Sequence, residues 1–256
     1  MTIQGCCAVL VRSDQCFRGF EEVWKAMISA NALVLSALIM SALMLPAFSV
    51  GVRSAQADPV KLPEPKYEGK VSVETALLER RSIRDYADEA VTLADVSQLL
   101  WAAQGLTDPS GYRTAPSAGA LYPLEVYLVA GKVASLPAGI YWYKPRGHEV
   151  VKVVEGDKRS ALCTAALGQT ALREAPASIV VTAIFERTTQ KYRDRGYRYV
   201  HMEAGHAAQN VCLQAGSLDL GTVVIGAFDD DDIKKVMQLT ATEEPLYIIP
   251  VGKRRR

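Results

Sequence analysis

The sequence predicts an α+β fold, in one domain that follows an N-terminal leader (1–57) and a proline-rich linker (58–70). Strand-like and helix-like segments mix after residue 70 without the regular β–α alternation of a doubly wound sheet. The chain has 256 residues, 49% of them hydrophobic, so it can bury a substantial core. No internal repeat and no second linker divides residues 71–256, which we therefore assign to a single domain.

The leader is strongly apolar at its centre. No charged residue lies between Ala26 and Val52, and Ala55 and Ala57 occupy the −3 and −1 positions of an A-x-A cleavage signal. We expect a signal peptide cleaved after Ala57 and an exported domain. The apolar run is also long enough to span a bilayer, so an uncleaved membrane anchor is the alternative. Met27 opens a more ordinary signal peptide than Met1, and either methionine can be the true start.

The domain begins with two predicted helices. The segment SVETALLERRS (72–82) has Ser72 as its N-cap residue. In TLADVSQLLWAAQG (92–105), Thr92 and Asp95 form a capping-box pair, apolar residues follow with helical spacing, and Gly105 ends the helix.

The remaining elements follow from runs of β-branched and aromatic residues or from helical spacing. Strands are predicted over 123–130, 139–144, 149–154, 178–185, 222–228 and 245–252, and helices over 159–167, 199–216 and 231–239. The second and third strands form a hairpin across PRGH (145–148). Cys212 falls in a helical pattern and is expected to be a small core residue.

Charge disfavours a nucleic-acid partner. The run QKYRDRGYRY (190–199) interleaves cations with tyrosines, as nucleic-acid surfaces do. However, 29 Lys and Arg against 28 Asp and Glu leave a net charge of only +1, without the surplus that such a surface needs. The run is then either a solvated helix entry or part of a site for one anionic, aromatic small molecule.

Several other types of functional site are excluded because the sequence lacks the motifs that form them. Neither a G-x-G-x-x-G nor a G-x-x-x-x-G-K-[ST] phosphate loop occurs. His201 and His206 are five residues apart, which on a helix separates their directions too far for a shared metal ion, so no metal site is predicted. The sequence around Ser117 lacks the G-x-S-x-G elbow of a serine hydrolase.

Three polar clusters are left: the segment RRSIR (80–84), the small-residue turn PSAGA (116–120) and the basic end VGKRRR (251–256). Each alone has an ordinary structural explanation, namely a dipole-complementing helix end, a turn and a solvated tail. Together they suit a phosphorylated flat ring. Arginine, lysine and serine bind phosphate, and a turn without bulky side chains lets backbone N–H groups approach the ring.

Four motifs carry a family resemblance: RRSIRDY, PSAGALYPLEVY, KYRDRGYRYVHMEAGHAAQN and VIGAFDDD, in this order. They resemble the SagB-type, azoline-oxidase-like branch of the FMN-dependent nitroreductase family, over residues 72–252. The resemblance implies a central, mostly antiparallel sheet flanked by helices, and a homodimer with two FMN sites at the subunit interface.

The resemblance also implies the site residues. The FMN phosphate and the pyrimidine side of the ring would be held by Arg80, Arg81, Ser82 and Arg84. The isoalloxazine would be lined, from the other subunit, by Pro116, Ser117, Ala118 and Gly119. The reactive edge of the ring would lie beside Gly226 and Ala227, and the phosphate site would be closed by Lys253 and one of the next arginines, taken as Arg255.

In azoline-oxidising members a Lys-Tyr pair serves the proton-transfer half of the oxidation, and the resemblance places it at Lys191 and Tyr192. Hydride loss from a substrate also requires a base for the adjacent proton. A lysine whose pKa is lowered by nearby cations can be that base, and Arg193 and Arg195 are close in sequence. The tyrosine can orient the substrate or relay the proton.

The predicted function is therefore an FMN-dependent oxidoreductase that exchanges a hydride with a small-molecule or peptide substrate. Azole-forming members usually carry an N-terminal docking region and work beside cytosolic partners. An exported protein would be separated from such partners, which leaves the substrate open. The alternatives are an NAD(P)H-dependent nitro- or quinone reductase and a non-catalytic flavin-binding protein.

Overall fold

The computed structural model describes residues 58–255. The predicted signal peptide or anchor, with its cleavage site after Ala57, lies outside these residues. Within 58–255, no helix combines the length and apolarity needed to cross a bilayer.

One seven-stranded sheet forms the centre of the domain, with strand order β1-β4-β3-β2-β5-β7-β6 and antiparallel pairing throughout. The strands are β1 (Val60–Lys61), β2 (Leu124–Ala130), β3 (Gly139–Lys144), β4 (Glu149–Glu155), β5 (Ala177–Ala183), β6 (Leu220–Thr222) and β7 (Glu244–Lys253). All seven residues of β5 are buried, as expected for a strand between two covered faces.

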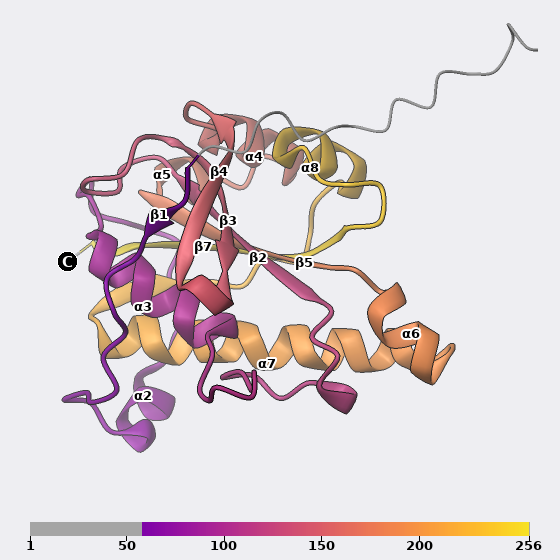
Figure 1. Ribbon diagram of the computed structural model, residues 1–256. Helices are drawn as coiled ribbons and strands as arrows, with labels where there is room; N and C mark the ends of the chain where they lie inside the picture. The colour runs from indigo at the N-terminus through magenta and orange to yellow at the C-terminus, as the bar shows by residue number, and fades with distance from the viewer. Residues whose placement is uncertain (1–57, 256) are drawn as a thin grey trace, which may run out of the picture. The chain divides into compact units, whose positions relative to one another are not determined.

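Helices cover both faces of this sheet (Figure 1). They are α2 (Val73–Glu79), α3 (Leu93–Gln104), α4 (Arg159–Ala165), α5 (Ala171–Glu174), α6 (Glu186–Tyr192), α7 (Arg195–Ser217) and α8 (Asp230–Met237). The core on one face combines the apolar residues of α3 and α7, and the core on the other combines those of α4 and α8. The α+β class and the mostly antiparallel sheet are confirmed.

The predicted helix ends are confirmed in detail. The Ser72 side chain accepts the Thr75 amide at the start of α2. Thr92 and Asp95 form the full capping box of α3, and Gly105 is its C-cap. Satisfying the unpaired amides of a first helical turn stabilises a helix by about 1 kcal/mol, which explains why these boundaries can be read from sequence.

Several predicted elements differ in length: the helix predicted over 72–82 ends at Glu79, and larger differences occur in one strand and in α7. The strand predicted over 222–228 ends at Thr222, because the chain leaves the sheet to reach α4, where the Asp229 amide donates to the Ala165 carbonyl (2.9 Å). Helix α7 begins at Arg195 and not at Tyr199, so it takes in the second half of the basic, tyrosine-rich run, and α6 takes in its first three residues.

The proline-rich segment 58–70 is packed against the domain. Its strand β1 pairs with β4, Leu62 is buried, and the Pro63 carbonyl accepts the Ser97 hydroxyl (2.5 Å). The Lys66 amide donates to Gln98 Oε1, and Gln98 Nε2 donates to the Lys66 carbonyl. The two cysteines within the described residues, Cys163 and Cys212, are both buried and unbridged.

Candidate active site

The segment after α2 lies along the edge of the sheet. The Ile83 amide donates to the Thr222 carbonyl (2.9 Å), and Ser82 forms a parallel bridge with Thr222. Four residues later Tyr86 bridges to Arg254. A Cβ on Gly221 would lie 2.7 Å from Ile83, so this approach requires a glycine in β6. The predicted cluster 80–84 and the described part of the basic end, 251–255, therefore lie close together, although they are far apart in sequence.

Two buried polar atoms at this edge lack a partner. Among the described residues, neither Thr222 Oγ1 nor Arg254 Nε has a hydrogen-bond partner. A buried donor left unpaired costs about 1–3 kcal/mol, and more if it is charged. A bound ligand or a water molecule can supply the missing partner. A phosphate fits this edge, because Ser82, Thr222 and Arg254 supply hydroxyl and guanidinium donors from three adjacent segments.

The other residues predicted to bind the phosphate differ in whether their side chains are already bonded within the protein and in how exposed they are. Arg81 donates to the carbonyls of Leu78 (2.9 Å) and Arg80 (2.8 Å), which ties its guanidinium to the end of α2. Lys253 forms an ion pair with Glu89 (3.1 Å). Arg84 and Arg255 are exposed, and Arg80 is half-buried near Cys212. Arg254, which the sequence prediction passed over for Arg255, is the C-terminal arginine whose Nε faces the interior.

The predicted ring-binding turn lies at the other end of α7. Pro116 and Ser117 lead into a short 3-10 turn over Ala118–Ala120. Gly119 has φ +66°, a left-handed conformation that favours glycine. A Cβ on this glycine would lie 2.8 Å from the Tyr192 hydroxyl and 3.0 Å from Lys191 Nζ. The turn and the predicted catalytic pair, about 70 residues apart in sequence, are thus in direct contact.

Lys191 and Tyr192 end helix α6. Lys191 is exposed, and its Nζ lies 5.4 Å from the centre of the Tyr192 ring, within cation–π range. The Tyr192 ring packs edge-on against Tyr199 (5.1 Å between centroids), which limits its rotation. The pair therefore presents an amino group and a phenol side by side at the turn, two groups that can serve proton transfer.

Gly226 and Ala227 lie in the loop between β6 and α8, and both are exposed. Gln169 donates to the Ala227 carbonyl (2.9 Å), which holds the loop. Gly226 borders a cavity of about 400 Å³ whose other walls include Phe185, Phe228 and Tyr247. Asp230 also lines this cavity, and burial raises the pKa of its carboxyl. This small cavity, partly lined by aromatic side chains, thus lies beside the residues predicted to border the reactive edge of the FMN ring.

The comparisons decide the family. Residues 77–253 match the nitroreductase family. A protein of Methanocaldococcus jannaschii named as a nitroreductase is 44% identical over 185 residues, which cover 72% of this chain and 92% of that protein. This chain belongs to the nitroreductase family.

Two further relatives place it within the family. The microcin B17-processing protein McbC of Escherichia coli is 32% identical over 165 residues, covering 62% of this chain and 61% of McbC. A crystal structure of an Anabaena variabilis protein named as a nitroreductase superposes with a TM-score of 0.69 at 31% identity, covering 78% of this chain and 42% of that one. The nitroreductase-like fold and the resemblance to the azoline-oxidase-like branch are confirmed.

One residue of this nitroreductase-family site was not predicted. Glu203, in the middle of α7, is 2% exposed, and the Gln104 side-chain amide donates to its carboxylate (3.4 Å). Burial raises its pKa to about 7. The sequence did offer one signal for this residue. Glu203 is an acidic residue on the apolar face of the predicted helix, with Val200, Ala204 and Ala207, which predicts a buried carboxylate.

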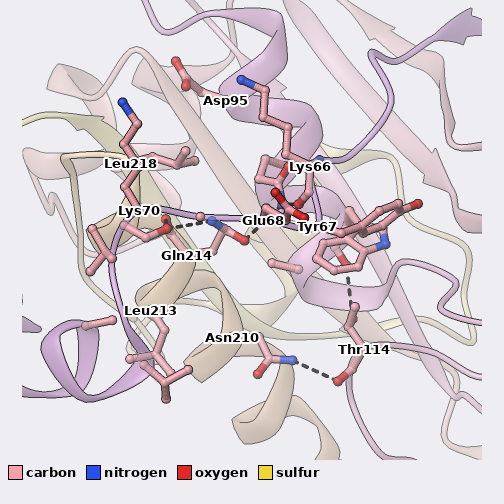
Figure 2. A pocket seen from close by; sticks show the side chains of 18 of the residues that line it. Lys66, Tyr67, Glu68, Lys70, Asp95, Thr114, Asn210, Leu213, Gln214 and Leu218 are labelled. Carbon is pink, nitrogen blue, oxygen red and sulfur yellow. Dashed lines mark hydrogen bonds between the residues drawn. The ribbon is translucent and has the colours of Figure 1, made fainter.

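Another cavity, drawn in Figure 2, lies away from these residues. It has a volume of about 800 Å³ and lies between residues 64–73, α3 and the C-terminal half of α7. Gln214 and Asn210 point toward it, and Asn210 donates to the Thr114 carbonyl (3.3 Å). None of the predicted site residues lines this cavity, so a site chosen by cavity volume would not contain them.

Proposed function

We propose that this nitroreductase-family oxidoreductase uses FMN, in the manner of the SagB-type branch, to exchange a hydride with a small-molecule or peptide substrate. The observation that carries the proposal is the contact of the Gly119 turn with Lys191 and Tyr192. A glycine in a left-handed turn lets these two side chains approach the backbone closely, and the contact supports a proton-transfer pair beside the turn.

The unpaired atoms of Thr222 and Arg254 support the phosphate half of the proposal. In this assignment Ser82, Thr222 and Arg254 hold the FMN phosphate, with Arg80 and Arg84 on the same segment, while the turn 116–119 faces the ring. Bound FMN supplies a two-electron acceptor for hydride. Lys191 takes the accompanying proton from the substrate, and Tyr192 orients the substrate or relays that proton.

A homodimer is part of the proposal, because one chain does not bring the two halves of the site together. Helix α7 has 23 residues and so spans about 35 Å. Arg80 lies near Cys212 toward its C-terminal end, whereas Gly119 contacts the residues just before its N-terminal end. In Figure 1, α2 and α6 lie at opposite ends of α7. A second copy that places its turn against the phosphate half would complete one site per subunit.

The substrate would enter beside Gly226, where the cavity of about 400 Å³ accepts a group of small-molecule size. McbC is named for processing microcin B17, and a peptide-borne ring is one candidate of suitable size. We further propose that the domain acts after export, which the A-x-A signal at Ala55 and Ala57 supports. The intact mass of the mature N-terminus tests cleavage, and an anchored full-length chain would contradict export.

The function is tested by the colour and redox behaviour of the purified protein. We expect a yellow protein whose flavin absorbance is bleached by dithionite, and FMN as the extracted chromophore. Nicotinamide cofactors are scarce outside the cytoplasm, so an exported protein would not have been selected for fast reaction with them. Anaerobic NADH or NADPH should therefore reduce this flavin slowly. A protein purified without flavin and unable to take up added FMN would contradict the proposal.

A NAD(P)H-dependent nitro- or quinone reductase is the second candidate, favoured by the 44% identity to a protein named as a nitroreductase. It shares the FMN site but does not use the Lys-Tyr pair. Stopped-flow reduction by NADH or NADPH at a rate on the order of 10 per second, unchanged in Lys191→Ala, would establish this alternative.

A further inference from the structure

Helix α6, which ends with Lys191 and Tyr192, is fastened by one arginine to the end of the turn segment 116–122. Arg187 donates from Nη1 to the Tyr122 carbonyl (3.1 Å), and its Nη2 forms an ion pair with Glu125 Oε1 (2.5 Å). The two bonds reach the last residue of the turn and the start of β2. A guanidinium can make both at once, because its N–H groups form a rigid, planar fork.

Both partners of Arg187 are themselves held by the domain. Glu125 lies in β2, its side chain is 11% exposed, and its second oxygen accepts the Trp142 indole N–H of β3 (2.7 Å). Tyr122 has φ +47°, and its amide donates to the Ser117 hydroxyl (2.9 Å). A left-handed non-glycine residue persists only where its surroundings hold it. Arg187 is therefore bonded to an anchored point of the sheet and to a strained point of the turn.

The face of α6 that carries Arg187 also carries Lys191. Arg187 is the second residue of the helix, where a cation is unfavourable beside the positive end of the helix dipole, so its bonds to the turn and to β2 offset that cost. Lys191 follows four residues later and lies on the same face. A Cβ on Gly119 would lie 3.0 Å from Lys191 Nζ. One face of α6 thus meets the segment 119–125 at both ends of the helix.

We propose that Arg187 is a positioning residue, which holds α6 against the turn so that Lys191 and Tyr192 stay beside Gly119. Helix α6 has seven residues, too few to be stable without contacts to the rest of the domain. Thr189 packs on Gly196 of α7 and restrains another face of the helix, whereas Arg187 supplies the restraint toward the turn. The consequence for proton transfer rests on the function proposed above, but the placement of the pair does not.

Hydrogen exchange of the FMN-free protein tests the anchor. The reporters are the amides of α6 and those of Ala120 and Tyr122, whose hydrogen bonds lie within the turn. Arg187→Ala removes an ion pair and a carbonyl bond and should lower the protection of these amides by at least about tenfold. Arg187→Lys keeps the charge without the fork, so its protection should lie between the two. Protection of β5 should be equal in all variants, which excludes general unfolding.

A fluorine resonance reports on the pair itself. 3-Fluorotyrosine in place of Tyr192 alone gives one resonance, whose chemical shift depends on the surroundings of the ring, including Tyr199 at 5.1 Å between centroids. In the FMN-free protein this resonance should move or broaden in Arg187→Ala and return toward its wild-type position in Arg187→Lys. A loss of global stability alone would leave the resonance of the folded protein unchanged.

Arg159→Ala is the matched control. Arg159 forms an ion pair with Asp157 (2.7 Å) and donates to the Ala175 carbonyl (3.2 Å), so this variant loses the same two kinds of bond in another part of the domain. It should keep the wild-type protection of the turn and the wild-type fluorine resonance. In the double variant, Glu125→Gln should add little to Arg187→Ala, since the two side chains act through one ion pair.

Wild-type protection of the turn together with an unchanged fluorine resonance in Arg187→Ala would overturn the proposal. An equal loss of protection in β5 would also overturn it, because Arg187 would then contribute to general stability alone. Both measurements use the protein without FMN, so a chain that fails to bind flavin would contradict the proposed function and leave these results unaffected.

Discussion

At the scale of single residues, the candidate site contains two kinds of side chain. Some have a buried polar atom without a hydrogen-bond partner, and others are already hydrogen-bonded within the protein. Arg254 Nε and Thr222 Oγ1 are buried without partners in the described part of the chain, and so both are available to a ligand at this edge. The Ser117 hydroxyl accepts the Tyr122 amide (2.9 Å), and so it supports the turn. Hydrogen-bond partners thus distinguish the candidate binding atoms at this edge from the supporting hydroxyl of the turn.

Arg254→Ala should weaken FMN binding by about 1.5–3 kcal/mol, or roughly 10- to 100-fold, because a charge-assisted bond to phosphate is lost. Arg84→Ala should behave similarly and purify with little flavin. Quenching of flavin fluorescence on titration measures both. Arg146→Ala, an exposed arginine in the β3–β4 turn, is the control. Nanomolar affinity in Arg254→Ala would remove this residue from the phosphate site.

Glu203→Gln should change how stability depends on pH. The folded pKa of Glu203 is raised, so its ionisation costs stability progressively from about pH 4.5 and fully above about pH 7. The variant lacks this cost and should exceed the wild type at pH 8 by up to about 3 kcal/mol, with little difference at pH 4.5. Urea denaturation at several pH values checks this. A stability difference that is the same at all pH values would contradict the raised pKa.

At the scale of elements, local chemistry places helix ends and turns, and these in turn place the reactive groups. The Ser72 N-cap and the Thr92–Asp95 capping box fix where α2 and α3 begin, and Gly105 marks where the segment 105–122 leaves α3. The 3-10 turn at Ala118–Ala120 and the end of α6 then meet through Gly119.

Gly119→Ala should destabilise the domain by about 1 kcal/mol through its left-handed backbone and should also displace Lys191 and Tyr192. Gly168→Ala provides the matched control, because Gly168 has φ +77° and open space around its Cα. Both variants should lose similar stability in chemical denaturation, but only Gly119→Ala should weaken FMN binding or turnover. Equal FMN affinity and turnover in the two variants would show that the close approach at Gly119 is unimportant.

At the scale of the whole molecule, the exposed apolar face of α2 supports the proposed dimer. Leu77 and Leu78 are 54% and 75% exposed, and Val73 on the same short helix is also exposed. Large apolar side chains grouped in this way commonly mark a protein interface. The helix lies directly before the phosphate segment, where a second copy must approach.

The double variant Leu77→Glu, Leu78→Glu should therefore sediment as a monomer at micromolar concentration and bind FMN weakly, because charged side chains would have to be buried in the interface. Leu167→Glu is the control, since Leu167 is 71% exposed on the opposite side of the sheet beside α4. A wild-type monomer that holds FMN tightly would rule out the dimer.

The amino-acid sequence alone predicted the α+β class, most of the strands and helices, the family and the segments of the candidate site. These features depend on local rules, such as the capping pair Thr92 and Asp95 or the apolar run of β5, and on motifs that are contiguous in the chain. The strand predicted over 222–228 was too long, because the departure of the chain toward α4 depends on a distant carbonyl of Ala165.

Only the tertiary structure decided which side chains meet. It selected Arg254 by the burial of its Nε, brought Gly119 to Lys191, and revealed Glu203 as a buried acid whose pKa is raised to about 7. Burial, unpaired donors and desolvation arise from packing between segments that are remote in sequence, and neither composition nor periodicity contains that information.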